Sequence, residues 1–454
     1  MSQVKDMTMG KPVNLMLRFS IPLLISNALQ LLFVVADSTI IGRILGVNAF
    51  ASIGATASPH FLVFSAVLGF NQGFSTLIAQ HFGAKDSDNL RKSFVTSIYI
   101  AAVLSIVLTT AGLATCRPLM ELLRTPQELI DGSVTYLNWL WAGMPLMFGY
   151  NLLAMTLFAL GDSKTPLRAM IVATVVNIAF NLILIFPFRI AGVAAATLIA
   201  QGSALIFCIK AIKKTGVFNG CGYKYDRDSI RPLLRLALPL GIRNSVIGVG
   251  GLLVQRYVNE MGTEFVAGVA AAKRMYSLVM IAGGAIEASV ATFVAQNFGA
   301  KQLDRIKQGV KDGLKLAIGS ALVIMAITLP LGRQLLSLFI DGDPVQISAV
   351  LDVGVLQLRF MTLGLPIVYL LFLYRAALQG LGNTFIPMLS GFVELAMRII
   401  SVVVLTQIFG YWGILISDPI AWPIATALLI IAYAIVFRRH VKEKLKSNTL
   451  LNED

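Results

Sequence analysis

Apolar residues occupy the chain in long blocks that are separated by short polar segments. Each block holds about 20 apolar residues, which is the length that an α-helix needs to cross the hydrocarbon core of a bilayer. The segments between the blocks are rich in Gly, Pro, Lys and Arg. This pattern predicts an all-α membrane protein with twelve spans, near residues 15–42, 48–80, 93–115, 133–160, 165–187, 190–212, 233–259, 264–297, 312–333, 350–379, 385–409 and 411–437.

The composition agrees with this pattern, because 57% of the residues are hydrophobic and only 13% are charged. Soluble globular domains carry about 25% charged residues. The polar N-terminus lacks the compact apolar core of a signal peptide, so we expect no cleavable signal and a first span that directs insertion. Three distant cysteines (Cys116, Cys208 and Cys221) and three scattered histidines argue against a disulfide framework, a zinc site and a His-based metal enzyme.

The basic residues are distributed asymmetrically along the predicted topology. The net charge is +14, and the N-terminus, the even-numbered loops and the C-terminal tail hold most of the Lys and Arg residues. The odd-numbered loops hold few, among them Arg43, Arg117 and Arg189. The positive-inside rule then places both termini in the cytoplasm of a multi-pass plasma-membrane protein. It accounts for the net charge without a nucleic-acid partner, and the basic tail is expected to contact anionic lipid headgroups.

Short motifs occur twice in the same order, with a nearly constant offset. The segment AQHFGAK at 79–85 recurs as AQNFGAK at 295–301. LGDSKTP, before the fifth span, recurs as LGNTFIP before the eleventh, and FSIPLLISN in the first span matches LALPLGIRN in the seventh. Several matches in one order indicate the duplication of a six-span unit.

Six spans are an even number, so both copies enter the membrane in the same direction. We therefore expect two six-helix lobes related by a pseudo-two-fold axis along the membrane normal, with alternating access to a central cavity. The predicted divisions are an N-lobe at 1–212, a cytoplasmic linker at 213–232, a C-lobe at 233–437 and a cytoplasmic basic tail at 438–454. Four prolines at matched places in spans 1, 4, 7 and 10 are candidates for gating or bending: Pro22, Pro145, Pro239 and Pro366. The alternative is that they have no such role, because prolines are common in membrane helices.

One acidic residue, Asp37, lies inside the first apolar block, in LFVVADSTIIGRILG. An ionised carboxylate in hydrocarbon costs about 3 kcal/mol on insertion scales, so such a residue is a functional candidate by default. The alternative is a residue at the end of the helix, near the headgroups. Desolvation favours the neutral acid and hydrogen-bond donors favour the anion, so a group held between the two can load and release a proton.

These motifs together resemble the multidrug and toxic compound extrusion (MATE) family of cation-coupled transporters. The resemblance covers almost the whole chain. Besides the repeated motifs, it rests on PLLISNALQLLFVVADSTIIGRILG in span 1, VVNIAFNLILIFPFRIAGVAAATLIAQ in spans 5–6 and GFVELAMRIISVVVLTQIFGYWGILISDPIAW in spans 11–12. It implies a V-shaped pair of six-helix lobes. It also implies the exchange of inward H+ or Na+ for outward organic compounds, which are often cationic and amphipathic.

The resemblance further implies a cation-coupling site at Asp37. In the family pattern, an asparagine followed four residues later by Asp or Asn lies near this acid, as does a threonine; here they are Asn177, Asn181 and Thr197. The two asparagines share one helix face, so they serve the site or act as interhelical packing groups. Because the set holds a single carboxylate, we expect H+ rather than Na+ as the coupling ion, and no metal site beyond Na+ at these oxygens.

The second half is not a chemical copy of the first. Val254 stands at the position equivalent to Asp37, and the start of span 7 carries Arg243 and no acid. Charged residues in the later spans are candidates for the substrate cavity or for a charge network: Glu287, Lys273, Arg274, Glu394 and Arg398. Glu394 and Arg398 are four residues apart, so they form either a self-neutralising pair or part of a network that changes partners during transport.

These features predict a secondary active antiporter that exports organic, cationic amphipathic compounds in exchange for H+ or Na+. The alternatives on the same two-lobe plan are a lipid-linked sugar flippase and an exporter of an anionic metabolite, which the basic second half keeps open. The sequence contains no HExxH cluster and no GxxxxGK[ST] loop, so we expect neither an enzyme nor an ATP-driven pump. Duplicated spans with buried charges argue against a receptor or scaffold. We expect a monomer without cofactors, whose partners are small organic molecules and membrane lipids.

Overall fold

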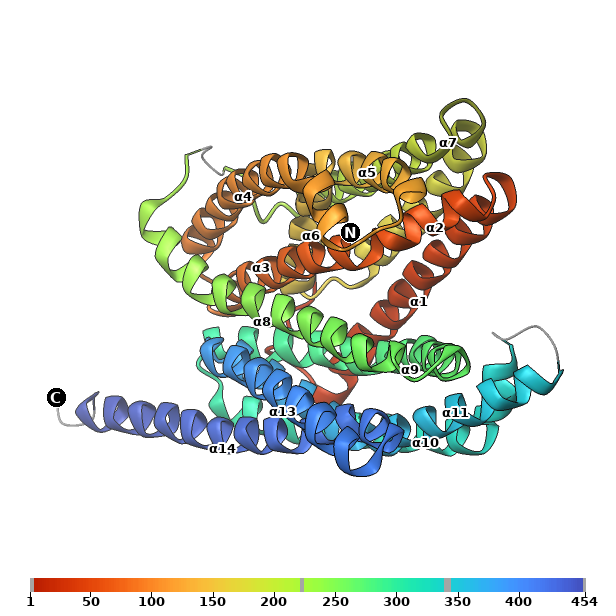
Figure 1. The fold of residues 1–454 in the computed structure, drawn as a ribbon. Helices are drawn as coiled ribbons and strands as arrows, with labels where there is room; N and C mark the ends of the chain where they lie inside the picture. The colour runs from red at the N-terminus through yellow and green to blue at the C-terminus, as the bar shows by residue number, and fades with distance from the viewer. Residues whose placement is uncertain (1–3, 221–223, 339–343, 452–454) are drawn as a thin grey trace. The chain divides into compact units, whose positions relative to one another are not determined.

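The computed structural model describes residues 4–220, 224–338 and 344–451, and across these ranges the chain forms α-helices and no β-strand (Figure 1). The prediction of an all-α fold is therefore confirmed. The helices are α1 (Pro12–Ile44), α2 (Val47–Ala55), α3 (Ala57–Gly83), α4 (Ser87–Leu122), α5 (Gln127–Ala142), α6 (Met144–Ala159), α7 (Lys164–Thr215), α8 (Arg227–Asn259), α9 (Thr263–Gly299), α10 (Leu303–Ser337), α11 (Pro344–Leu363), α12 (Leu365–Gly380), α13 (Phe385–Phe409) and α14 (Tyr411–Leu451). Cys116 and Cys208 are buried free thiols, and Cys221 lies outside the described residues.

The helices account for the predicted spans. Within the described ranges, nine helices are long and apolar enough to cross a membrane, and the number is eleven when each of two bent helix pairs counts as one span. α7 counts once in this number, although its backbone leaves the helical region at Arg189, with φ 52° and ψ −126°. Its two halves correspond to the predicted spans 5 and 6, so the twelve predicted spans are all present.

The two bent pairs divide at prolines. α5 meets α6 at 50°, and α11 meets α12 at 47°. Pro145 and Pro366 stand in the first turn of α6 and of α12. Proline lacks an N–H group and disfavours a helical conformation in the preceding residue, so each span bends there. Pro22 and Pro239 instead lie inside the continuous helices α1 and α8. A gating role for these four prolines stays a prediction.

The duplication is visible in the backbone as well as in the sequence. Residues with a positive φ angle occur at matched places in the two halves, because each copy makes the same turns. The matched pairs are Gly46 (83°) and Gly262 (91°), Lys85 (58°) and Lys301 (56°), Gly161 (79°) and Gly382 (80°), and Arg189 (52°) and Gly410 (60°).

One close contact occurs in both halves and shows which residue of the first half corresponds to which residue of the second. A Cβ atom on Gly192 would lie 2.1 Å from the carbonyl oxygen of Leu184, which shows how closely the two halves of α7 approach. A Cβ atom on Gly413 would lie 2.3 Å from the carbonyl carbon of Leu405, where α13 and α14 make the same approach. The equivalent positions are therefore separated by 221 residues in this part of the chain.

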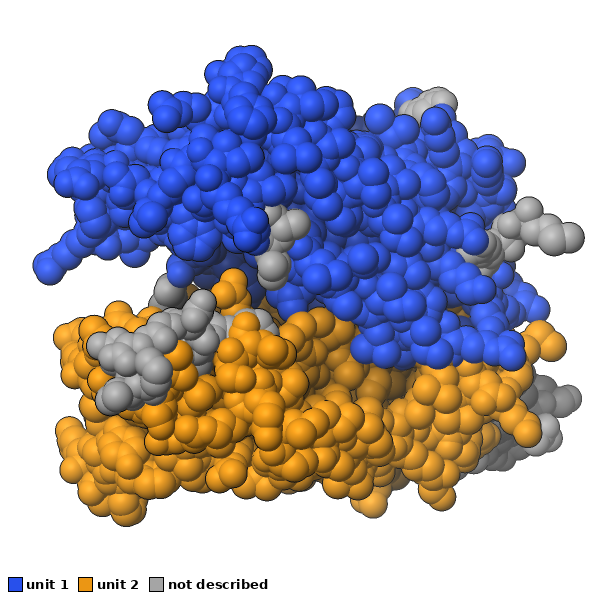
Figure 2. Space-filling model, turned by 90° about the vertical axis from the view of Figure 1, so that its right-hand side faces the viewer, with its two compact units in different colours: residues 1–7, 18–241 blue, residues 8–17, 242–454 orange. Residues whose placement is uncertain are grey.

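The helices form two compact units, which Figure 2 colours separately. Unit 1 contains residues 1–7 and 18–241, and unit 2 contains residues 8–17 and 242–454. α1 thus begins in unit 2 and continues in unit 1, whereas α8 begins in unit 1 and continues in unit 2. The boundaries of these units follow from which helices pack together. The predicted boundaries at 212 and 233 instead follow from the sequence repeat, and they stay a prediction.

Within unit 1, two glycines allow α8 to pack closely on α3. A Cβ atom on Gly69 would lie 2.4 Å from the carbonyl oxygen of Leu240, and one on Gly73 would lie 2.3 Å from the Cα atom of Ala237. The two glycines are four residues apart, which is the spacing that lets membrane helices approach at their backbones. The first half of α8 is therefore held in unit 1 by backbone-to-backbone packing.

We expect Gly73→Ala to lower the stability of the protein by about 1–3 kcal/mol, because the new methyl group would collide with the backbone of α8. The matched control is Gly202→Ala in α7, since an added Cβ atom there would meet nothing within 4 Å. This control should be neutral or slightly stabilising, as alanine favours the helix more than glycine does. Thermal unfolding of the purified variants measures the difference, and equal midpoints for both variants would contradict the role of Gly73.

Candidate cation-coupling site

Asp37 lies in the part of α1 that belongs to unit 1, and only 8% of its surface is exposed. Its Oδ1 atom accepts a hydrogen bond of 2.5 Å from the side-chain amide of Asn181 in α7. The two residues are 144 positions apart in the sequence. The structure therefore joins the acid of the first span to the fifth span.

The two asparagines of α7 are fully buried on one face of the helix. The amide nitrogen of Asn181 also donates to Oδ1 of Asn177, at 3.2 Å. The remaining oxygen of Asn181 and the amide nitrogen of Asn177 are buried and make no hydrogen bond with the described residues. A buried polar atom without a partner carries a desolvation cost. The Asn181 oxygen is therefore an unused acceptor that can face a proton or a cation, whereas the Asn177 nitrogen is an unused donor.

Thr197 lies in the second half of α7 and is also buried. Its hydroxyl group donates to the carbonyl oxygen of Val193, at 3.2 Å, within the same helix. Among the described residues, no recorded hydrogen bond connects Thr197 to Asp37 or to the asparagines. Its membership of the site stays a prediction.

Apolar side chains flank this polar group. Ile41, one turn after Asp37, packs against Ile185, one turn after Asn181, and against Val193. All three are almost completely buried. An apolar wall lowers the local dielectric and strengthens the interaction between a carboxylate and any bound cation. The site therefore combines one carboxylate, amide oxygens and restricted access to water.

Unit 2 holds a different arrangement, which is a chain of ion pairs. Glu394 in α13 accepts hydrogen bonds from Arg375 in α12, at 2.8 Å, and from Arg398, at 3.0 Å. Arg398 also pairs with Asp418 in α14, at 2.5 Å. Arg375 and Glu394 are only 3% and 5% exposed. The predicted pair of Glu394 and Arg398 is therefore real and belongs to a larger buried network.

The other predicted charges of unit 2 lie around this network. Glu287 in α9 pairs with the buried Arg243 of α8, at 3.7 Å. The Lys273 ammonium contacts the side-chain oxygen of Gln255, at 3.4 Å, and lies within electrostatic range of Asp418. For Arg274, the described part of the structure records no ion pair or hydrogen bond. Whether any of these residues contacts a substrate stays a prediction.

The repeat relates the two polar groups to each other. With the offset of 221 residues, Arg398 stands at the position of Asn177 and Asp418 at the position of Thr197. Val254 replaces Asp37, as noted from the sequence. At this position unit 2 thus has Arg398, an arginine of α13 that pairs with two acids. Unit 1 has a neutral amide side chain at the equivalent position.

Two members of the network, Arg375 and Asp418, were missed by the sequence analysis. Each is the single charged residue of a long apolar stretch, at 360–379 for Arg375 and at 411–437 for Asp418, and a hydropathy average over such a stretch stays high despite one charge. The repeat would have revealed both, because their equivalents in the first half are the uncharged Ala154 and Thr197. Charged residues without a charged counterpart are the signal that could have identified the network.

Comparison with known proteins agrees with the fold and the repeat. The family profile described as MatE matches residues 22–183 and 239–412, which lie in the two halves of the chain. The Bacillus subtilis protein named "Probable multidrug resistance protein YoeA" is 32% identical over 336 residues, covering 71% of this chain and 72% of the relative. The "FAD transporter" of Shewanella oneidensis is 25% identical over 419 residues, covering 89% and 90%.

Solved structures share the same fold. The protein described as "Crystal structure of MATE in the straight conformation" superposes with a TM-score of 0.88 at 19% identity, covering 97% of this chain and 99% of that one. The resemblance inferred from the sequence motifs is therefore confirmed, including the arrangement of twelve helices in two lobes. The chain belongs to the multidrug and toxic compound extrusion (MATE) family of membrane transporters.

Proposed function

We propose that this protein is a secondary active antiporter that exports organic, cationic amphipathic compounds in exchange for H+, with Asp37 as the proton-carrying group. The observation that supports this best is the buried contact between Asp37 and Asn181. The membership of a multidrug transporter family supports the direction and the substrate class. Alternating access between the two sides of the membrane would couple the two fluxes.

The geometry supports a simple proton cycle at Asp37. The ionised carboxylate accepts a hydrogen bond from the amide nitrogen of Asn181, while the amide oxygen of Asn181 has no partner among the described residues. When a proton binds, the neutral acid becomes a donor, and a turn of the amide would present its oxygen to that new O–H group. Both protonation states can then be hydrogen-bonded, which is what a group that loads and releases protons requires.

Na+ is the alternative coupling ion. Carboxylate and amide oxygens are suitable ligands for a hard cation. The site offers a single carboxylate, however, and one oxygen of that carboxylate already accepts a hydrogen bond from the Asn181 nitrogen. A proton needs only one oxygen and one acceptor, so this donor set favours H+.

A second candidate function is the export of an anionic metabolite, and the charge balance of unit 2 favours it. The charged groups in and around the network comprise four basic and three acidic side chains: Arg243, Lys273, Arg375, Arg398, Glu287, Glu394 and Asp418. An unbalanced basic side chain in low dielectric attracts an anion. The relationship to a protein named "FAD transporter" points the same way. A lipid-linked sugar flippase on this plan would carry an anionic substrate too.

We further propose that the protein crosses the plasma membrane with both termini in the cytoplasm and acts as a monomer without a cofactor. The proposal rests on the distribution of basic residues and on the family. The basic end of α14 then lies at the cytoplasmic surface, where anionic headgroups attract it.

In proteoliposomes loaded with ethidium, we expect a pH gradient alone to drive ethidium transport and a Na+ gradient alone to leave it at the background of empty liposomes. A fluorescence assay of ethidium measures both. Transport that needs Na+ would contradict the choice of coupling ion. If neither gradient moves ethidium although the protein is folded, while FAD or another anion is moved, the second candidate function replaces the first.

A further inference from the structure

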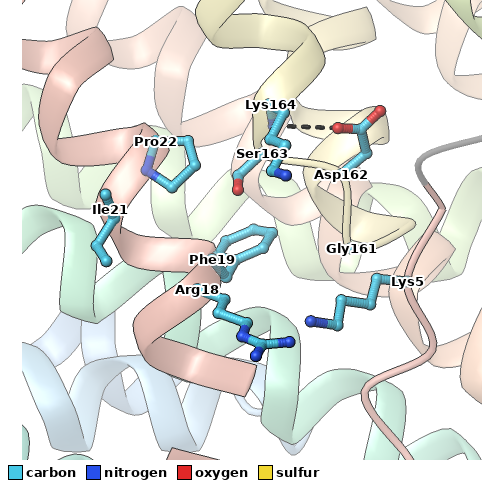
Figure 3. A pocket seen from close by; sticks show the side chains of 9 residues that line it. All are labelled: Lys5, Arg18, Phe19, Ile21, Pro22, Gly161, Asp162, Ser163 and Lys164. Atoms are coloured by element: carbon cyan, nitrogen blue, oxygen red, sulfur yellow. Dashed lines mark hydrogen bonds between the residues drawn. The ribbon is translucent and has the colours of Figure 1, made fainter. Parts of the chain in front are cut away.

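A basic pocket lies in unit 1 at the turn between α6 and α7, away from Asp37 (Figure 3). Its volume is about 540 Å³. It is lined by Lys5 before α1, by the start of the unit 1 part of α1 and by the α6–α7 turn: Lys5, Arg18, Phe19, Ile21, Pro22, Gly161, Asp162, Ser163 and Lys164. The three cations come from three separate segments of the chain.

The cations of this pocket are directed toward one another. In Figure 3, the ammonium group of Lys5 and the guanidinium group of Arg18 point toward each other across the pocket, with Lys164 above them. Burial, followed by the charges of Arg18 and Lys164, holds the pKa of the Lys5 ammonium below its usual value. The three positive charges therefore repel one another, and an anion placed between them would relieve that repulsion.

The backbone holds Lys5 in this position. The N–H group of Lys5 donates to the carbonyl oxygen of Leu160, at 3.0 Å. Gly161 has a φ angle of 79°, and a Cβ atom on it would lie 2.1 Å from the carbonyl oxygen of Lys5. Only glycine suits both its conformation and this close contact. The N-terminal segment is thus bound to the turn, and its lysine is fixed beside the other two cations.

The acid in the pocket forms its hydrogen bonds with the start of α7. Asp162 is the only acidic residue among the described residues that line it. One carboxylate oxygen accepts from the N–H groups of Lys164 and Thr165, both at 3.0 Å, and the other accepts from the Thr165 hydroxyl at 2.5 Å. Asp162 therefore caps the start of α7, and within the described ranges it makes no ion pair with the side chain of Lys5, Arg18 or Lys164.

The second half of the chain shows that the turn does not need the lysine. The N–H group of Gly382 donates to Gln379 at 2.9 Å, as that of Gly161 donates to Phe158 at 2.8 Å, so the two turns have the same hydrogen bonds. At the position of Lys164, however, the second half carries Phe385. The fold of the turn is compatible with an uncharged residue there, so the turn itself does not require the positive charge of Lys164.

We propose that this pocket binds a phosphate group, held jointly by Lys5, Arg18 and Lys164. A guanidinium group binds two phosphate oxygens in a fork, and ammonium groups add point charges around them. The phosphate can belong to the headgroup of an anionic phospholipid or to a soluble phosphate compound. Both share the chemistry that the pocket recognises, and binding can be measured without transport, so the proposal is independent of the antiport cycle.

Two binding assays on the purified, delipidated full-length protein separate these sources. Isothermal titration with inorganic phosphate tests a soluble ligand. Native mass spectrometry with dioleoylphosphatidylglycerol tests a lipid headgroup at the tightest site. Phosphate binding would identify a soluble ligand, and phosphatidylglycerol binding alone would identify the headgroup. Binding of neither probe by the unmodified protein would overturn the proposal.

The test variant is Arg18→Gln with Lys164→Gln, and we expect it to weaken the binding of the active probe by about tenfold or more. The matched control is Lys92→Gln with Lys213→Gln, which removes two exposed cations that do not line the pocket. It should change the affinity by less than about twofold. Equal losses in both variants would show a nonspecific charge effect and overturn the proposal. Lys5→Gln, outside the helices, provides a second test if the first variant fails to fold.

Discussion

Proton-driven ethidium transport is expected to fall to the background of empty liposomes when Asp37 is replaced by Asn. The substitution preserves the size of the side chain and leaves an oxygen that can accept the hydrogen bond from Asn181. It removes the only carboxylate of the candidate site, so the site can no longer take up a proton. The measurement is the initial rate of ethidium flux under an imposed pH gradient, with the protein content of each vesicle preparation matched.

The repeat offers a matched control for this variant. Val254 is the equivalent of Asp37 in the second half, and it is buried in the apolar cluster of unit 2. Val254→Asn introduces the same side chain into the equivalent helix without touching Asp37. We expect it to retain proton-driven flux in whatever fraction of the protein folds. If Asp37→Asn transports normally while folded, another group carries the proton and the proposed cycle is wrong.

A comparison of uncoupled flux separates a coupling role from a structural one. Folded Asp37→Asn protein that still passes ethidium down its own concentration gradient, without a response to pH, has lost coupling and kept the pathway. A variant that fails to fold instead shows that the Asp37–Asn181 contact stabilises α1 against α7. Size-exclusion profiles and thermal midpoints distinguish the two cases before any flux is measured.

The sequence predicted the helices well, because membrane spans are set by local composition. A block of apolar residues must satisfy its own backbone hydrogen bonds in the bilayer, so length and hydropathy are enough to locate it. The breaks at Arg189 and Gly410 fell where the predicted spans 5 and 11 end. Helix pairs bend next to Pro145 and Pro366, whereas Pro22 and Pro239, which the same rule also marked, lie inside continuous helices.

Long-range side-chain partners could not be predicted in that way. The contact between Asp37 and Asn181 joins residues 144 positions apart, and it was expected only because of the family resemblance. Nothing local to Arg375 or Asp418 indicates that they share a network with Glu394 and Arg398. Their pairing depends on how α12, α13 and α14 pack, which hydropathy does not determine.

The repeat nevertheless suggests why the two halves differ in chemistry. Arg398 replaces Asn177, and its guanidinium group is neutralised by Glu394 and Asp418. A covalently attached cation cannot be released, so unit 2 is not suited to exchange a coupling ion at this position. On this interpretation, duplication produced two equivalent polar positions, of which unit 1 kept the exchangeable one.

The second large effect is expected for Glu394→Gln, which should destabilise the protein by about 3–5 kcal/mol. The variant leaves the buried guanidinium of Arg375 without its acidic partner, while Arg398 keeps Asp418. The free-energy cost of a buried charge without a partner is much larger than the net stabilisation that the buried ion pair provides. The free energy of unfolding in a denaturing-detergent titration measures the loss, and the thermal midpoint should fall with it.

An exposed ion pair serves as the control. Arg333 and Asp352 are 52% and 65% exposed, so Asp352→Asn should cost less than about 1 kcal/mol. Combining Glu394→Gln with Arg375→Met removes the uncompensated charge and should restore most of the lost stability. If Glu394→Gln is as stable as the unmodified protein, the network does not contribute to folding in the way that its burial indicates.

The double variant also decides between the two interpretations of this network. If the ion pairs are a static lock, the restored protein should transport at nearly the rate of the unmodified protein, because only packing was needed. If Glu394 changes partners between Arg375 and Arg398 during the cycle, the double variant should be stable and slow. Stability and transport would then separate in one protein, which a purely structural role of the charges does not allow.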